Sequence, residues 1–294
     1  MMCLENNEQP EVSDDSSIFP STCKMAKHRR FSINPILNSS LTTKDFPLIS
    51  AKVLYVENKK LITKIFAALP KLDKKFQHLK RVNNNKILIS VGEDCVNDEE
   101  ENLFTIKELL GQEEIEISQQ FVPRNVPLTK TQCELAKKYW PVSFHKNSLL
   151  EAKLDEQYFS QKEIELYSNL FIKVELTEGV LFYDSQNNKI VCTATTNPTH
   201  PLKHAVIECV DNLAKIQEKE RTSKDGQYLA TGYDAILFKE PCTMCAMALV
   251  HCRVKRIFFG LENKNSGALI TKWRLQESNS LNHHFEVFQI KEIF

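Results

Sequence analysis

The sequence predicts an α/β protein of two domains, and three observations lead to this fold class. The chain has 294 residues, more than one domain usually holds. Apolar residues make up 42% of the chain, which is enough to fill two cores. Strand-like and helix-like runs alternate in two separate regions, 46–122 and 156–294, with a proline-punctuated stretch between them.

Residues 1–45 are predicted to form a disordered tail. They mix Ser, Asp, Glu, Asn and Pro with few apolar residues and show no hydrophobic period, so ordering them would cost more than it gains. The tail holds a basic cluster, which is typical of a nuclear localisation signal or a nucleic-acid-binding arm but also arises often by chance. Its members are Lys24, Lys27, Arg29 and Arg30.

The region 46–122 is predicted to be a small α/β domain. A β-rich run at 51–56, a helical pattern at 61–70 that a proline ends, and a second β-rich run at 86–91 indicate a βαβ unit. After an acidic loop, the pattern predicts a helix near 105–111 and a strand at 115–122. The expected result is an open α/β sandwich.

Positive charge concentrates in this first domain, although the whole chain has 38 basic and 38 acidic residues and no net charge. Between 51 and 90, ten basic residues stand against only Glu57 and Asp73. Such a patch fits a phosphate-backbone footprint, and the alternative is an ordinary solvated lysine-rich face. The nucleic-acid hypothesis names Lys59, Lys60, Lys64, Lys71, Lys74, Lys75, Lys80 and Arg81.

Residues 123–155 are predicted to be a linker with one short helix, because prolines 123, 127 and 141 punctuate them. Trp140 precedes the last of these prolines. We expect it to anchor the linker onto one domain. The alternative is a contact to RNA through Trp140 itself with Lys137, Lys138, Tyr139 and His145.

The region 156–294 is predicted to run helix, two strands, helix, strand, helix, strand. The expected helices are residues 160–176 and the segments that follow His204 and Cys242. The expected strands are 179–184 and 189–196, which form a hairpin, then 234–240 and 256–260.

A metal-ligand pattern lies at the starts of the last two helices. His204 precedes one helix, and Pro-Cys-x-x-Cys at 241–245 begins the other. His with Pro-Cys-x-x-Cys is the ligand set of zinc-dependent nucleobase deaminases, and helix starts favour thiolates. The alternative is that Cys242 and Cys245 are buried core cysteines, which is common for free cysteine. The spacing therefore predicts Zn²⁺ bound by His204, Cys242 and Cys245.

The residue two positions after His204 decides what such a site can do. In these deaminases it is a glutamate that moves protons between the zinc-bound water and the base, and here it is Val206. Valine has no titratable group. Glu208 is the nearest carboxylate, but two residues along a helix rotate a side chain by about 200°, so it should point away from the metal.

These residues carry a resemblance to a known family. The runs EPCTMCAMALVHCRVKRIFFG at 240–260, HAV at 204–206, GAL at 267–269 and LNHHFEVF at 281–288 resemble the non-catalytic subunits of eukaryotic heterodimeric tRNA-specific adenosine deaminases. The resemblance covers about 140–294 and implies a cytidine-deaminase-like α/β/α three-layer domain. The basic N-terminal domain is what such subunits add to the homodimeric bacterial enzyme.

The resemblance implies a protein that does not deaminate alone. It would pair with a catalytic subunit carrying the intact His-x-Glu, bind tRNA through its N-terminal domain, and use its zinc structurally while the complex converts wobble adenosine to inosine. Two alternatives stay open. One is an active nucleoside or cytidine deaminase that uses a displaced carboxylate such as Glu208, and the other is a zinc-stabilised RNA-binding protein without a deaminase partner.

The composition also predicts a cellular setting. Nine cysteines, an odd number with no secretory leader before them, fit a reducing compartment better than a disulfide framework. No apolar run approaches the roughly 18 residues that span a bilayer, so we expect no membrane contact. The expected location is nucleus and cytoplasm.

Overall fold

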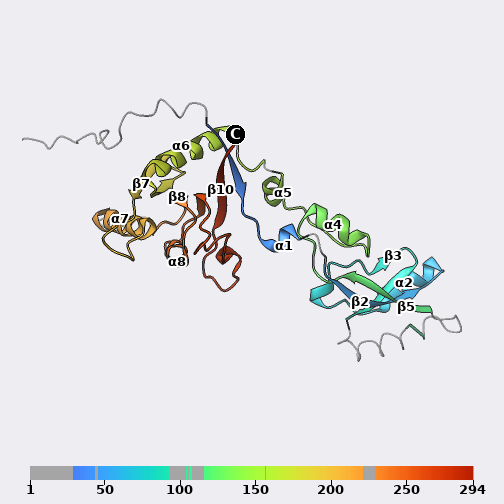
Figure 1. Cartoon of the computed structure of the whole chain (residues 1–294). Coiled ribbons are helices and arrows are strands. Elements are labelled where there is room, and N and C mark those ends of the chain that lie inside the picture. Colours follow the sequence, from blue (N-terminus) through green and yellow to red (C-terminus); the bar gives the residue numbers. More distant parts are fainter. Residues whose placement is uncertain are drawn as a thin grey trace, which may run out of the picture.

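The computed structural model describes residues 29–43, 46–92, 104, 106–107, 116–155, 157–220 and 229–293. Two sheets organise this part of the chain, and they lie at opposite ends of the molecule (Figure 1). The larger sheet has six strands in the order β1-β10-β9-β8-β6-β7, and the smaller has four in the order β3-β4-β2-β5. No helix in the described part is long and apolar enough to cross a membrane.

The larger sheet is the middle layer of an α/β/α domain. Strands β8, β9 and β10 run parallel to one another, whereas β1, β6 and β7 pair antiparallel with their neighbours. Helix α6 packs on one face, and helices α7 and α8 pack on the other. The strands are β1 (Arg30–Pro35), β6 (Val180–Asp184), β7 (Lys189–Ala194), β8 (Asp234–Lys239), β9 (Arg256–Leu261) and β10 (Glu286–Ile293), and the helices are α6 (Gln161–Thr177), α7 (Ala205–Glu220) and α8 (Thr243–His251).

The predicted three-layer class is thus confirmed. A capping box at Ser160 and Glu163 begins α6. Strands β6, β8 and β9 are buried on both faces, as expected of a sheet covered on both sides. Figure 1 shows α6 on the opposite side of this sheet from α8.

The smaller sheet is antiparallel throughout. Helix α2 covers one face of it, and α4 with Trp140 covers the other. Its strands are β2 (Leu48–Tyr55), β3 (Val82–Asn83), β4 (Lys86–Val91) and β5 (Glu116–Pro123). The helical segments are α2 (Lys59–Ala68), η2 (Lys74–Phe76) and α4 (Lys130–Lys137), and α1 (Ser39–Thr42), α5 (Ser148–Leu154) and η3 (Leu275–Glu277) lie elsewhere in the chain.

The predicted βαβ unit is wrong. Strand β2 pairs antiparallel with β4, because the chain turns back through β3 in a tight hairpin before β4 begins. Asn84 in that turn has φ 52°, a left-handed conformation that asparagine tolerates. Of the helix predicted near 105–111, residues 106 and 107 are helical, as is 104, and the rest lies outside the described residues.

Two predicted boundaries also change. Residues 30–35, assigned to the disordered tail, form β1, because Phe31 and Ile33 alternate into the core beneath α6. The rest of that tail lies mostly outside the described residues. The first part of the predicted linker belongs to the N-terminal domain, since α4, Trp140 and Val142 help to form that domain's core. Strand β10 was not predicted.

Candidate metal centre and nucleic-acid interface

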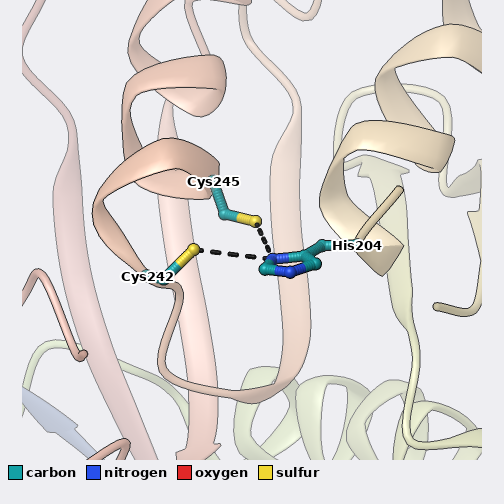
Figure 2. A group of neighbouring side chains, drawn as sticks. All are labelled: His204, Cys242 and Cys245. Atoms are coloured by element: carbon teal, nitrogen blue, oxygen red, sulfur yellow. Dashed lines mark hydrogen bonds between the residues drawn. The ribbon is translucent and has the colours of Figure 1, made fainter. Parts of the chain in front are cut away.

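The structure brings the three predicted ligands together. The sulfurs of Cys242 and Cys245 lie 3.5 Å and 3.4 Å from Nδ1 of His204, and all three ligand atoms fall within 4.8 Å of one another. Figure 2 shows both sulfurs, at the start of α8, directed at the imidazole beside the start of α7. His204 and Cys242 accept the first backbone hydrogen bonds of these helices, from Glu208 and Ala246. Each ligand is therefore fixed by a helix end.

The donor set fits zinc. Ligand lengths of about 2.3 Å for sulfur and 2.0–2.1 Å for nitrogen, at a tetrahedral angle, separate the two donors by about 3.5 Å. The observed sulfur–nitrogen distances match this without movement. Hydrogen bonds from the Cys245 thiol and backbone amide, together with His204, lower the pKa of Cys242 to about 5. A thiolate is the form that binds metal.

A cavity of about 410 Å³ opens beside the three ligands. Val206 lines it, is 3% exposed, and belongs to the core between α7 and the sheet. Glu208 lines a different hollow, with Thr195 and Asn212, and its carboxylate lies 3.2 Å from the Lys203 ammonium. The prediction that Glu208 points away from the metal site agrees with this placement.

Two other carboxylates border the cavity, and sequence reasoning singled out neither. Glu178 is an exposed residue in a left-handed conformation at the end of α6. Glu240 is 2% exposed and directly precedes Pro241. The Oε1 atom of Glu240 accepts the amides of Leu269, Ile270 and Thr271, and its Oε2 accepts the Asn263 amide and the Thr271 hydroxyl.

Glu240 is therefore a structural anion. Burial alone would raise the pKa of its carboxyl, but the four backbone amides hold that pKa below its ordinary value. The loop lies so close that a Cβ on Gly267 would stand 2.2 Å from the carboxylate. Gly267 also forms an isolated antiparallel β-bridge with Cys242, so the Glu240 carboxylate ties the loop 263–271 to the metal-binding turn.

Most of the predicted RNA-contacting cations are exposed on the N-terminal domain. They are Lys59, Lys60, Lys64, Lys71, Lys74, Lys75 and Lys80. Lys59 and Lys60 lie in the first turn of α2, which contains no acidic residue. Positive charge there opposes the helix dipole, so these lysines do not serve helix stability. Phe66, 53% exposed, stands two turns along from Lys59 and offers a stacking face.

Arg81 differs from the lysines. It is half-buried, and its guanidinium donates to the carbonyls of Pro70 and Ile89, at 2.8 Å and 3.4 Å. Burial lowers the pKa of this guanidinium. We therefore assign Arg81 to holding the segment after α2 against β4 rather than to the exposed basic surface.

The end of α4 adds to that surface. Trp140 is fully buried and donates its indole N–H to the Lys80 carbonyl at 2.6 Å, so the predicted anchor role agrees with the structure. The anchor bonds the Lys80 backbone to Trp140 and Pro141, which directly follow the exposed residues Lys137, Lys138 and Tyr139. The sequence allows two interpretations of this segment, a packing anchor and an RNA contact, and the structure is compatible with both.

The structure describes two residues, Arg29 and Arg30, of the basic cluster in the predicted tail. Lys24 and Lys27 lie outside the described residues. Arg29 donates to Glu175 and Glu292, which raise its pKa, so its charge is already paired. The predicted location in nucleus and cytoplasm stays a prediction.

Comparison with known proteins places the metal centre in context. The family model described as the zinc-binding region of cytidine and deoxycytidylate deaminases matches residues 155–261, a range that contains all three candidate ligands. A Danio rerio protein named probable inactive tRNA-specific adenosine deaminase-like protein 3 is 33% identical over 201 residues. The match covers 57% of this chain and 60% of that relative's length.

Two further relatives extend the comparison. A Saccharomyces cerevisiae protein named tRNA-specific adenosine deaminase subunit TAD3 is 28% identical over 242 residues, covering 72% of this chain and 74% of the relative. A Rickettsia bellii tRNA-specific adenosine deaminase is 30% identical over 121 residues, covering 40% of this chain and 78% of the relative.

Proposed function

Because the chain belongs to the tRNA-specific adenosine deaminase family, we propose that it is the non-catalytic, tRNA-binding subunit of a heterodimeric deaminase. The observation that carries this proposal is Val206, a buried apolar residue where the proton-transferring glutamate belongs, in a site whose metal ligands are otherwise complete. The word "inactive" in the name of the Danio rerio relative supports the same assignment.

The proposed cofactor is one zinc ion held by His204, Cys242 and Cys245. Zinc bound there supplies a Lewis acid and a fourth position for water. Position 206 holds valine in place of the carboxylate that would move that water's protons. Of the two carboxylates that border the cavity, Glu240 is buried and fully engaged by the loop 263–271, and Glu178 is exposed at the end of α6. The metal is then structural, tying the start of α7 to the start of α8.

The proposed partners are a catalytic subunit with an intact His-x-Glu, and tRNA. The Saccharomyces cerevisiae relative is named a subunit, which supports a partner deaminase. The complex would convert adenosine to inosine at the tRNA wobble position. One subunit needs a pocket for the flipped base, while the folded RNA body can be held by phosphate contacts on the other.

The exposed lysines of the N-terminal domain test the tRNA assignment. We expect a triple variant with Lys59, Lys60 and Lys64 all changed to alanine to weaken tRNA binding by the complex. The slope of the logarithm of the binding constant against the logarithm of salt concentration should fall in magnitude by about one per lysine lost. In steady-state deamination, KM for tRNA should rise while kcat stays near that of the wild type.

A matched control removes the same charge elsewhere. Lys162, Lys215 and Lys219 are exposed lysines of the deaminase-like domain, and their triple alanine variant should bind tRNA nearly as the wild type does. Equal weakening by both triple variants would show that only overall charge matters, which would contradict a binding surface on the N-terminal domain.

A further inference from the structure

The N-terminal domain is an insertion within the deaminase-like domain. Strand β1 belongs to the larger sheet, where it pairs with β10, and the chain then leaves to build the whole smaller sheet before returning through α5 to α6. Figure 1 shows α1 and α5 both lying between the two sheets. Two chain segments therefore connect the domains, and both must be fixed if the domains are to keep one orientation.

Hydrogen bonds to η3 fix the first connector on the deaminase-like side. The Ser39 amide and hydroxyl donate to the two carboxylate oxygens of Glu277, at 3.0 Å and 2.8 Å. Arg274 donates to the Leu37 carbonyl at 2.6 Å and also to Glu277. Both connector residues, Leu37 and Ser39, are thus held by one pair of charged side chains.

The buried side-chain amide of Gln132 fixes the same connector to the N-terminal domain. Gln132 of α4 is 7% exposed, and its Nε2 donates to the Ser40 carbonyl at 2.7 Å. Its Oε1 accepts the Leu128 amide at 3.0 Å, which orients the side chain. Helix α1 therefore bonds to both domains through consecutive residues, Ser39 and Ser40.

The second connector is held in a similar way. The Lys130 amide at the start of α4 donates to Glu151 of α5 at 2.9 Å, and Lys153 of α5 pairs with Glu286 at the start of β10. Tyr158 donates to the other oxygen of Glu286 at 3.1 Å. The two connectors thus make parallel sets of polar contacts to the same two domains.

The two connector helices contribute no fully buried side chain to this junction. Neither α1 nor α5 contains a buried residue, and a cavity of about 200 Å³ lies between Leu41, Leu150, Glu277 and Phe285. Leu41, Leu150 and Leu154 of these helices are only half-buried, so the polar contacts are the most specific restraint on rotation of one domain against the other. Removing a central hydrogen-bonding group should therefore loosen the junction without unfolding either domain.

We infer that Glu277 is a positioning residue. Together with Arg274 and Gln132, it fixes the orientation of the RNA-binding domain relative to the deaminase-like domain. The functional half of this inference rests on the proposed function. A tRNA held by its body on one domain reaches the deaminating pocket only as often as the geometry between the two attachment points allows. A loose junction then leaves tRNA affinity intact and lowers the rate at which bound tRNA reacts.

The test compares Glu277→Ala with Glu262→Ala in the full-length chain bound to its catalytic partner. Glu262 is an exposed glutamate of the same domain and serves as the matched control. We expect amide exchange in the segment 37–43 of Glu277→Ala to rise about tenfold or more, because two hydrogen bonds to a charged group are lost. Small-angle scattering should show a broader distribution of interdomain distances, while the melting temperature stays unchanged.

The kinetic readout separates positioning from binding. For Glu277→Ala we expect kcat on intact tRNA to fall about fivefold or more while the Kd for tRNA changes by less than about twofold. This is the opposite pattern to that of the α2 lysine variants. Glu277→Gln, which keeps an acceptor for Ser39, should recover part of the loss.

Exchange and scattering identical to those of Glu262→Ala would overturn the inference, and so would a loosened junction with unchanged kcat. Failure of the proposed function looks different. In that case the lysine variants would leave tRNA binding unaltered, while Glu277→Ala would still speed exchange in the connector.

Discussion

Replacing Glu240 by glutamine tests whether the loop beside the metal centre depends on one buried charge. The carboxylate receives four backbone amides and one hydroxyl at 2.7–3.1 Å. A glutamine oxygen can still accept the three amides on the Oε1 side. Its NH₂ group would face the Asn263 amide, donor against donor, so at least one hydrogen bond is lost and three lose their charge assistance.

The expected cost follows from those contacts. A buried donor left unpaired costs about 1–3 kcal/mol, and hydrogen bonds to a charged acceptor contribute about 1.5–3 kcal/mol each against about 1 for neutral ones. These costs sum to about 2.5–9 kcal/mol, and because contacts to one group are not additive we expect a loss of about 3–5 kcal/mol. For a domain of this size, 1 kcal/mol lowers the melting temperature by about 2–4 °C, so a fall of about 6–20 °C is expected.

The assay is thermal unfolding followed by circular dichroism, with bound zinc measured by elemental analysis on the same samples. Glu262→Gln is the control, because Glu262 is exposed and precedes the same loop. Glu240→Gln should melt lower and retain less zinc than this control. A fall of under about 2 °C with full zinc retention would refute the assignment of Glu240 as the anchor of the loop.

Three further predictions follow from other contacts. Asp234 is fully buried and pairs with Arg256, so Asp234→Asn should cost about 3–5 kcal/mol in urea unfolding, and Asp234→Asn with Arg256→Met should cost less than the sum of the single changes. Cys242→Ser should abolish stoichiometric zinc in elemental analysis, and chelation of the wild type should speed amide exchange at the starts of α7 and α8; unaltered exchange would mean that the metal ties nothing together. Burial raises the pKa of the Glu277 carboxyl, but hydrogen bonds from Arg274 and Ser39 lower it further, so the folded pKa lies below the ordinary value. The stabilisation of segment 37–43 by this carboxylate is therefore present above the unfolded pKa of about 4.3 and is lost as pH falls through the folded pKa. Amide exchange of segment 37–43, measured from pH 6 to pH 3 and compared with Glu277→Ala, should show this loss.

The metal centre could be predicted from sequence because its geometry is local. His204 and the pair Cys242 and Cys245 each sit at a helix start, and helix starts follow from short-range signals such as Pro241 and the apolar runs behind it. The replacement of the glutamate is also visible in the sequence, because Val206 stands two residues after His204. Both features depend on short-range sequence signals alone.

The edge of the larger sheet could not be predicted in the same way. Strand β1 has only Phe31 and Ile33 as an apolar signal, and its partner in β10 lies more than 250 residues along the chain, as the pairing of Arg30 with Ile293 shows. The βαβ pattern predicts β4 parallel to β2, but the hairpin turn at Asn84 reverses the chain just before β4. Tertiary pairing decides the place of β1, which local pattern does not record, whereas the direction of β4 depends on this local turn.

The most direct test of the account is inosine formation on a tRNA with adenosine at the wobble position. The preparations are this chain alone, a catalytic His-x-Glu partner alone, and the two co-expressed, each also with Val206→Glu in this chain. We predict inosine only from the co-expressed pair, with Val206→Glu adding nothing to the isolated chain. Deamination by the isolated wild-type chain would contradict the account, and loss of that activity in Glu178→Gln or Glu208→Gln would identify the proton carrier that replaced the missing glutamate.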